Sequence, residues 1–293
     1  MLIKEQLQTY QFSSAEQVTV DFLLAHPEEI QALTIQTLAT KTFTQPSTIV
    51  RIAKKLNFRG WKDLKLAYLA EWDYLRRHFT KTDANLPFSQ TDSLMTVTKK
   101  IADLEQSAIS DIHSLLEHDS LSAIKRQLVD ANNIRIFAQN ANLLISKDFA
   151  LKMNRIGKHV SHSEIKGESL YEAYNLTDQD CAILISYSGE NVSLLAINDV
   201  LKQANVPTIA ITSIGDNQLS RDCTHFLPIT TREKLYSKIG NFTTNISIIC
   251  LLDILYSLVF SEHYDQNLKQ LRDKGHAIDK RVINTDIMRE NEM

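Results

Sequence analysis

Residues 34–65 read TIQTLATKTFTQPSTIVRIAKKLNFRGWKDLK. Two short helices are predicted here, separated by a turn at Phe43. Thr44 is placed to cap the second helix, and Pro46 is tolerated in its first turn. An apolar stripe at helical spacing runs along that helix, formed by Ile49, Ile52, Ala53 and Leu56. The stretch therefore predicts a helix-turn-helix inside an all-α N-terminal domain.

The face opposite this stripe is polar and basic. Residues 41–66 hold seven basic residues and one acidic residue, a local net charge of +6, in a chain whose overall charge is -3. A basic stripe in an acidic chain indicates a polyanionic partner, although a solvated helix face is the alternative interpretation. Short polar residues approach base edges and basic residues neutralise phosphates. The expected contacts to double-stranded DNA are Thr44, Gln45, Ser47, Thr48, Arg51, Lys54, Lys55, Arg59 and Lys62.

The hydrophobic period changes after about residue 131. Short apolar runs alternate with amphipathic stretches at residues 134–138, 158–162, 181–186, 207–212 and 225–229. Buried strands that alternate with helices predict a parallel sheet covered on both faces. We expect a doubly wound, flavodoxin-like α/β domain with five parallel strands, followed by a long helix over residues 243–260. That helix carries Asp253 and is predicted to be buried rather than to span a membrane.

Length and composition fit two soluble domains. The chain has 293 residues, of which 43% are hydrophobic and 23% charged. We expect a DNA-binding domain over residues 1–79, a polar linker over 80–92, and the α/β domain with a C-terminal helical tail over 93–293. The three cysteines are dispersed, the histidines lack a metal-ligand spacing, and no signal peptide is visible. No metal, cofactor or membrane is expected, and the predicted location is the cytoplasm.

The segment ISYSGEN, residues 185–191, ends one predicted strand and opens a helix. Backbone N–H groups and the helix dipole favour an anion at such a place. Ser186 and Ser188 add hydroxyl donors, and Gly189 lets the backbone approach a ligand closely. Glu190 repels a phosphate, so it is predicted to bind sugar hydroxyls or to cap a helix. A plain capped turn, without a ligand, is the alternative interpretation.

These motifs resemble the RpiR-type regulators, which join an N-terminal helix-turn-helix to a C-terminal SIS (sugar isomerase) domain. The segment TIVRIAKKLNFRGWKDLK resembles the family's recognition helix and the turn after it, and ISYSGEN resembles its phosphate loop. The resemblance implies a transcription regulator, a homo-oligomer of two or more subunits, whose operator affinity is changed by a phosphorylated sugar. It implies effector contacts from Ser186, Ser188, Gly189, Glu190 and Asn191.

One segment departs from the family pattern. SIS domains carry G-x-G-x-S after their first strand, whereas this chain has Ala138 to Asn142 there, AQNAN. Asn140 tolerates a left-handed backbone, and the Asn142 amide can donate a hydrogen bond. Both residues are therefore predicted to line a modified effector site.

Two other functions remain open at this stage. A phosphosugar isomerase uses the same α/β domain, and Glu168, His162 and His225 are available as acids or bases. The basic helical domain has no use in an isolated isomerase, however. The second alternative is a DNA-binding oligomer that has lost its effector. The altered segment after the first strand, residues 138–142, favours this alternative.

Overall fold

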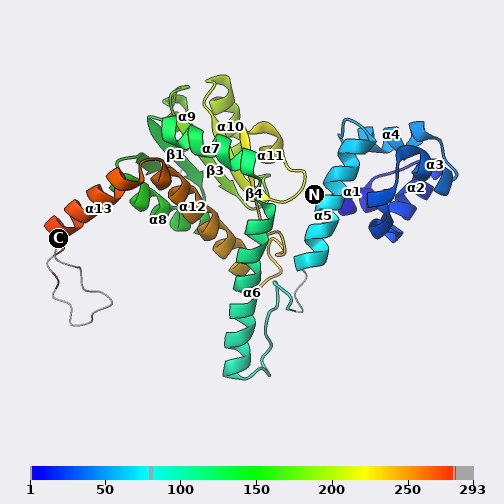
Figure 1. Ribbon diagram of the computed structural model, residues 1–293, viewed down its shortest axis with the longest axis horizontal. Coiled ribbons are helices and arrows are strands. Elements are labelled where there is room, and N and C mark those ends of the chain that lie inside the picture. The colour runs from blue at the N-terminus through cyan, green and yellow to red at the C-terminus, as the bar shows by residue number, and fades with distance from the viewer. Residues whose placement is uncertain (1, 79–81, 166, 280, 282–293) are drawn as a thin grey trace.

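The computed structural model describes residues 2–78, 82–165, 167–279 and 281. Figure 1 shows a helical N-terminal part and a larger α/β part. The helical part contains α1 (Ile3–Thr9), α2 (Ser14–Ala25), the 3-10 helix η1 (Pro27–Ala32), α3 (Ile35–Lys41), α4 (Pro46–Lys55) and α5 (Trp61–His78). The apolar stripe of α4 lies in its buried core, as predicted, and Trp61 at the start of α5 packs there too.

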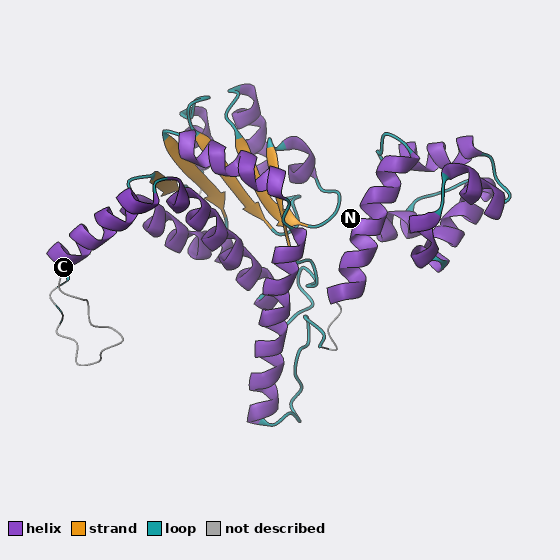
Figure 2. Cartoon of the chain, viewed as in Figure 1, coloured by secondary structure: helices purple, strands orange, loops and turns teal. Residues whose placement is uncertain are grey.

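Five parallel strands form the centre of the second part (Figure 2). They are β1 (Asn133–Ala138), β2 (His159–His162), β3 (Cys181–Ser186), β4 (Thr208–Ser213) and β5 (His225–Ile229). The strand order β2-β1-β3-β4-β5 is that of a doubly wound, flavodoxin-like sheet, so the predicted fold class is confirmed. All five strands lie where the apolar runs predicted them.

The remaining helices are those that cover both faces of this sheet, and α13, which extends away from it (Figure 1). They are α6 (Leu94–Leu115), α7 (His118–Asp130), α8 (Ala141–Arg155), α9 (Ser169–Tyr174), α10 (Val192–Gln203), α11 (Gln218–Asp222), α12 (Phe242–Glu262) and α13 (Tyr264–Ile278). Alternate residues of β3 point to opposite faces: Ile183 packs in the core under α8 and α12, and Leu184 packs in the core under α9, α10 and α11. Because both faces are covered, β3 is buried along its whole length.

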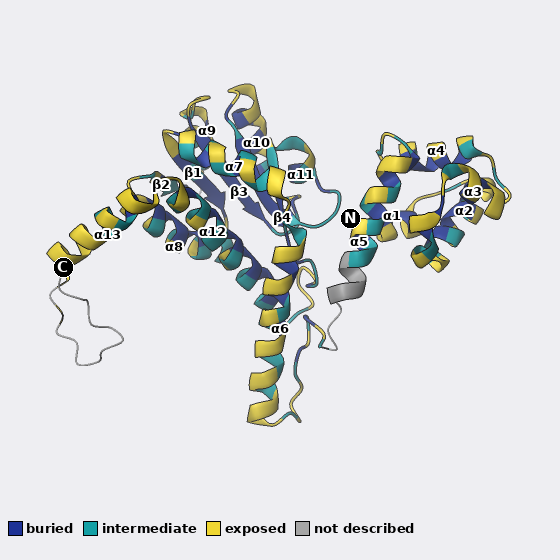
Figure 3. Cartoon of the chain, viewed as in Figure 1, coloured by how far each residue is buried: buried dark blue, intermediate teal, exposed yellow. Residues whose placement is uncertain are grey.

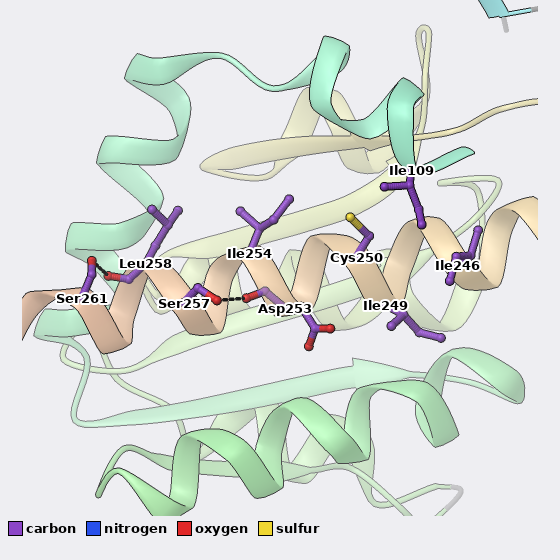
Figure 4. A pocket seen from close by; sticks show the side chains of 9 residues that line it. All are labelled: Ile109, Ile246, Ile249, Cys250, Asp253, Ile254, Ser257, Leu258 and Ser261. Carbon is purple, nitrogen blue, oxygen red and sulfur yellow. Dashed lines mark hydrogen bonds between the residues drawn. The ribbon is translucent and has the colours of Figure 1, made fainter. Parts of the chain in front are cut away.

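The helix α12 is, within the described residues, the one whose length and composition could cross a membrane. Its inner side packs in the core of the α/β part, as the sequence predicted for a buried helix. Its outer side, with part of α6, borders an apolar groove of about 490 Å³ (Figure 4). The groove is lined by Ile109, Ile246, Ile249, Cys250, Asp253, Ile254, Ser257, Leu258 and Ser261.

Candidate functional site

The turn between α3 and α4 differs in detail from its prediction. Gln45, not Thr44, is the N-cap of α4, and Pro46 is the first helical residue. The Thr44 hydroxyl instead lies 3.2 Å from that of Thr19 and 2.8 Å from that of Thr42, so Thr44 links α4 to the helices packed behind it. Phe43 has a φ of 51° and is 97% exposed, which places a bulky residue where a helix end favours glycine.

The outer face of α4 carries part of the predicted DNA-binding set. Ser47, Arg51 and Lys54 are exposed, as is Gln45 at the N-cap. Thr48, however, is only 5% exposed. Thr48 therefore lies beside the buried apolar stripe of α4, and its contact with a base edge stays a prediction.

Lys55 is also engaged inside the protein. Its Nζ lies 2.7 Å from the Oε2 of Glu16, a buried carboxylate on α2, and 5.7 Å from the ring centroid of Phe12. The Oε1 of Glu16 lies 3.8 Å from Nε of Arg51, whose side chain remains 63% exposed. Lys55 therefore helps to hold α4 against α2, and its contact with a DNA phosphate stays a prediction.

Burial alone would raise the pKa of the Glu16 carboxyl group. Hydrogen bonds from the Lys55 ammonium and from the backbone and side chain of Ser13 outweigh burial, and the net effect lowers the pKa from 4.5. Glu16 therefore stays ionised and keeps its partners at neutral pH.

Beyond α4, Arg59 and Lys62 extend the exposed basic surface. The backbone N–H of Arg59 donates to Asp63 over 3.0 Å, which fixes the turn into α5 and leaves the Arg59 side chain outside. Figure 3 shows the exposed outer side of α4 in yellow. The exposed members of the predicted set are Gln45, Ser47, Arg51, Lys54, Arg59 and Lys62.

The second candidate site lies at the carboxyl ends of β1 and β3, where the strand order reverses. In the loop after β3, the backbone N–H of Gly189 donates to Ser186 Oγ over 3.2 Å, and that of Glu190 donates to Ser188 Oγ over 3.2 Å. Gly189 has a φ of 68°, a conformation that suits glycine. The loop therefore folds tightly on itself before α10 begins.

The loop after β1 meets the loop after β3. Asn140 has a φ of 53°, a positive value that glycine adopts readily and that asparagine tolerates better than most residues. The Asn142 amide donates to the carbonyl of Ile185 over 3.5 Å. The side-chain oxygen of Asn191 caps α10 by accepting from the N–H of Leu194, while its amide donates to Gln139 over 3.2 Å. Asn191 thus joins the two loops.

A pocket of about 610 Å³ opens between these loops. The structure brings together there all the predicted effector residues except Gly189, which lies just beneath the lining. Neighbours of these residues in the two loops also line the pocket, and residues from far along the chain complete the wall, namely Leu235, Lys238, Asn241 and Thr244. No sequence pattern marked these residues, because they lie in and just after an aperiodic loop far along the chain. Among the described residues that line the pocket, Lys238 is the one lysine or arginine.

Lys238 is positioned by two neighbours. Its Nζ lies 3.3 Å from Oε2 of Glu233 and 5.2 Å from the ring centroid of Tyr187. The Tyr187 hydroxyl donates to the carbonyl of Glu233 over 2.6 Å. Glu233 also accepts at Oε1 from the N–H of Thr243 over 2.6 Å, at the start of α12. The ammonium group is therefore held at the pocket wall by a buried carboxylate.

Glu190 lines the pocket, but one of its carboxylate oxygens is directed toward the start of α11. Its Oε1 accepts from the N–H of Gln218 over 2.9 Å, at the first residue of α11. Of the two predicted roles, this contact favours helix capping.

The three acids and bases considered for an isomerase are not assembled. His162 ends β2 and His225 begins β5, so in a parallel sheet they lie at opposite edges. Glu168 is the N-cap of α9. One group of possible metal ligands occurs in the described part of the chain, at His26, Glu28 and Glu29 on the surface of the helical part, and Glu29 is paired there with Lys41.

Comparisons with known proteins agree with both parts of the structure. Residues 1–73 match the helix-turn-helix domain of the rpiR family, and residues 127–258 match the SIS domain. An uncharacterized HTH-type transcriptional regulator of Caldanaerobacter subterraneus is 25% identical over 273 residues, covering 93% of this chain and 95% of that protein.

Two solved structures share the fold. The Vibrio vulnificus NanR protein complexed with ManNAc-6P has a TM-score of 0.58 at 20% identity, covering 94% of this chain and 97% of that one. A putative sugar-phosphate isomerase from Listeria monocytogenes has a TM-score of 0.55 at 15% identity, covering 62% of this chain and 98% of that one. With an rpiR-family helix-turn-helix domain joined to a SIS domain, the chain belongs to the RpiR-type transcriptional regulators.

Proposed function

We propose that this regulator binds operator DNA through α4 and controls genes of sugar metabolism in response to a phosphorylated sugar. The observation that carries the proposal is the pocket at the ends of β1 and β3, where the N-termini of α8 and α10 meet Lys238. Helix N-termini present unpaired N–H groups and a positive dipole end, and a lysine adds a full charge. This combination suits a phosphate group.

The chemistry of the pocket wall defines the effector class. Ser186, Ser188 and Asn191 surround the helix N-termini, while Asn140 and Asn142 stand where other SIS domains have small residues. Amide groups can bind hydroxyl or acetamido groups of a sugar. The complex of NanR with ManNAc-6P supports an amino sugar phosphate as the first compound to test. Glu190 and Gly189 complete the proposed effector site.

The DNA-binding surface is assigned to exposed residues around α4. Ser47 and Arg51 lie where side chains of a recognition helix reach base edges, and Lys54, Arg59 and Lys62 are available for phosphates. Gln45 adds an amide at the start of the helix. We place the DNA-binding domain at residues 1–79, the linker at 80–92 and the SIS domain at 93–293, and we propose a non-enzymatic regulator that acts in the cytoplasm.

A homodimer would present two recognition helices to two half-sites. We propose that a second copy covers the apolar groove between α6 and α12. Ile109 and Ile249, from the two helices, are 44% and 40% exposed on its rim. Homodimer interfaces are more apolar than other surfaces, and this groove has an almost wholly apolar lining.

Effector binding is tested by calorimetry with ManNAc-6-phosphate and a panel of hexose and hexosamine phosphates. Ser188→Ala should weaken binding by about 1.5–3 kcal/mol, the range for a hydrogen bond to a charged group. Lys238→Ala should weaken it by a similar amount, and Asn142→Ala by less, because its amide donates to Ile185. Ser110→Ala, an exposed serine on α6, is the control. If no compound binds, the effector-free oligomer becomes the better interpretation, and turnover of a panel member would favour an isomerase.

DNA binding is tested with a duplex selected from a random pool by the wild-type protein. Ser47→Ala or Arg51→Ala should weaken binding to that duplex by about 1–3 kcal/mol if each side chain contacts a base. Lys62→Ala should weaken binding to selected and scrambled duplexes alike and reduce the salt dependence. Lys99→Ala, on α6, is the control. Wild-type affinity in all three variants contradicts the assignment of this surface.

A further inference from the structure

The loop between β5 and α12, residues 230–241, has two sides. On its pocket side lie Leu235, Lys238 and Asn241. Glu233 ties the loop to the start of α12 through Thr243 and Thr244, with Thr244 Oγ1 donating over 2.7 Å. A movement of Lys238 toward a bound phosphate would therefore displace the middle of the loop, while the loop stays attached to the start of α12.

The other side of this loop is hydrogen-bonded to Asn85 of the linker. The backbone N–H of Lys234 donates to Asn85 Oδ1 over 2.6 Å, and the Asn85 amide donates to the carbonyl of Arg232 over 3.4 Å. The N–H of Ile239 donates to the carbonyl of Asn85 over 2.9 Å. These three contacts bracket the stretch that carries Leu235 and Lys238.

Both partners of this contact are anchored. Asp83 Oδ1 accepts from the backbone N–H of Asn85 over 2.8 Å and from its side-chain amide over 2.9 Å, which fixes the rotamer. Hydrogen bonds from the backbone and side chain of Asn85 lower the pKa of Asp83, so this acceptor is ionised at neutral pH. Arg232 is held by Ser107 and by the buried carboxylate of Asp111 on α6. The linker and the loop thus meet as two ordered segments.

We propose that Asn85 is a positioning residue for the effector pocket and couples its occupancy to the DNA-binding domain. The proposal rests on the proposed function. Asn85 is the seventh residue after the end of α5, so a displacement of the loop by a ligand acts on the chain that leads to the helix-turn-helix. Coupling is reciprocal: a linker arrangement selected by DNA changes the geometry around Lys238.

The test compares Asn85→Ala with Gln90→Ala, an exposed residue of the same linker. ManNAc-6-phosphate, or the panel compound that binds the wild-type chain most tightly, is the probe. Asn85→Ala removes both side-chain hydrogen bonds to the loop and keeps the backbone contact to Ile239. The affinity for the probe should then fall about 2- to 10-fold, the range for a change of about 0.5–1.4 kcal/mol. The ratio of DNA affinities with and without the probe, about 5- to 150-fold in coupled systems, should fall toward one. Gln90→Ala should keep the wild-type values.

A merely structural role would lower the melting temperature without changing the DNA-affinity ratio, and an unchanged ratio in folded Asn85→Ala overturns the coupling. Failure of the proposed function is visible separately, because the wild-type chain then binds no panel compound. In that case, amide hydrogen exchange of the ligand-free protein tests whether Asn85 holds the loop in place. The Lys234 amide should exchange faster in Asn85→Ala than in Gln90→Ala, and equal exchange rates overturn the proposal.

Discussion

Gly189 lies so close to the side chain of Asn217 that a Cβ atom at residue 189 would overlap the Asn217 amide group. It would also lie 2.8 Å from Thr212 Oγ1, and the φ of 68° adds strain for any side chain. Asn217 cannot move away cheaply, because its side-chain oxygen accepts from the N–H of Ser220 and caps α11. The loop after β3 is thus packed directly against the start of α11.

Gly189→Ala should destabilise the protein by about 1–3 kcal/mol, the usual cost of overpacking. The same variant should weaken binding of a sugar phosphate, since the loop must shift. Gly275→Ala is the matched control: Gly275 lies in α13 with open space around it, so alanine should stabilise by about 0.5–1 kcal/mol. Urea denaturation measures both. Equal stability of Gly189→Ala and wild type would contradict the packing described here.

Phe43→Gly should stabilise the helix-turn-helix. A residue other than glycine in the left-handed conformation destabilises the fold by about 1–2 kcal/mol, so glycine relieves this cost. Glycine also makes the unfolded chain more flexible, which offsets about 0.5–1 kcal/mol of the stabilisation. Because the Phe43 ring is 97% exposed, little buried area is lost. Phe43→Ala, which keeps a Cβ at the same φ, should stay within about 0.5 kcal/mol of wild type. A thermal melt in which glycine is no better than alanine would disprove the strain.

Lys54→Ala and Lys55→Ala should have opposite consequences although the residues are adjacent. Lys54 is exposed, so its loss should weaken DNA binding and leave stability within about 0.5 kcal/mol. Loss of Lys55 leaves the buried Glu16 carboxylate with fewer partners and should cost about 1–3 kcal/mol of stability. Chemical denaturation and fluorescence anisotropy with the selected duplex separate the two effects. Two variants with the same profile would refute this division.

Stability should depend on pH through Glu16. The pKa of this group is lowered in the folded protein from 4.5, so the folded state binds fewer protons than the unfolded state. Its stabilisation is therefore fully present above the unfolded pKa and is lost as pH falls through the folded pKa. The stability difference between wild type and Glu16→Gln should shrink over that acidic range. A difference that stays constant from neutral pH into that range would argue against the ionised contact.

Ile249→Glu should convert a dimer into monomers if a second copy covers the groove beside α12. Ile249 lies on this groove, and a charge there would be buried without a partner in the interface. Leu151→Glu, on α8 and 58% exposed outside the groove, is the control and should remain dimeric. Light scattering at micromolar concentration provides the measurement. A monomeric wild-type chain, with and without DNA, would exclude the proposed homodimer.

The local sequence was sufficient for the five strands, their order along the chain and the helix-turn-helix. A continuous apolar run such as CAILIS predicts a strand buried on both faces, because successive side chains of a strand point to opposite faces of the sheet. The pocket lies where the sequence placed the effector loops, because the carboxyl ends of parallel strands meet at one edge of the sheet. The short helix α1 escaped prediction. It has seven residues, and its start is fixed by the distant Glu71, which accepts from the N–H of Lys4 over 2.8 Å.

Only the tertiary structure decided which polar residues remain available for a ligand. Lys54 and Lys55 look alike in sequence, but α2 brings Glu16 to Lys55 and not to Lys54. Lys238 joins the pocket because a loop far along the chain returns to the ends of β1 and β3. Side-chain pairing depends on long-range packing, whereas periodicity reports only which face of an element is apolar. The sequence by itself therefore determined the two domains and their faces, and folding selected the charged groups that act at each face.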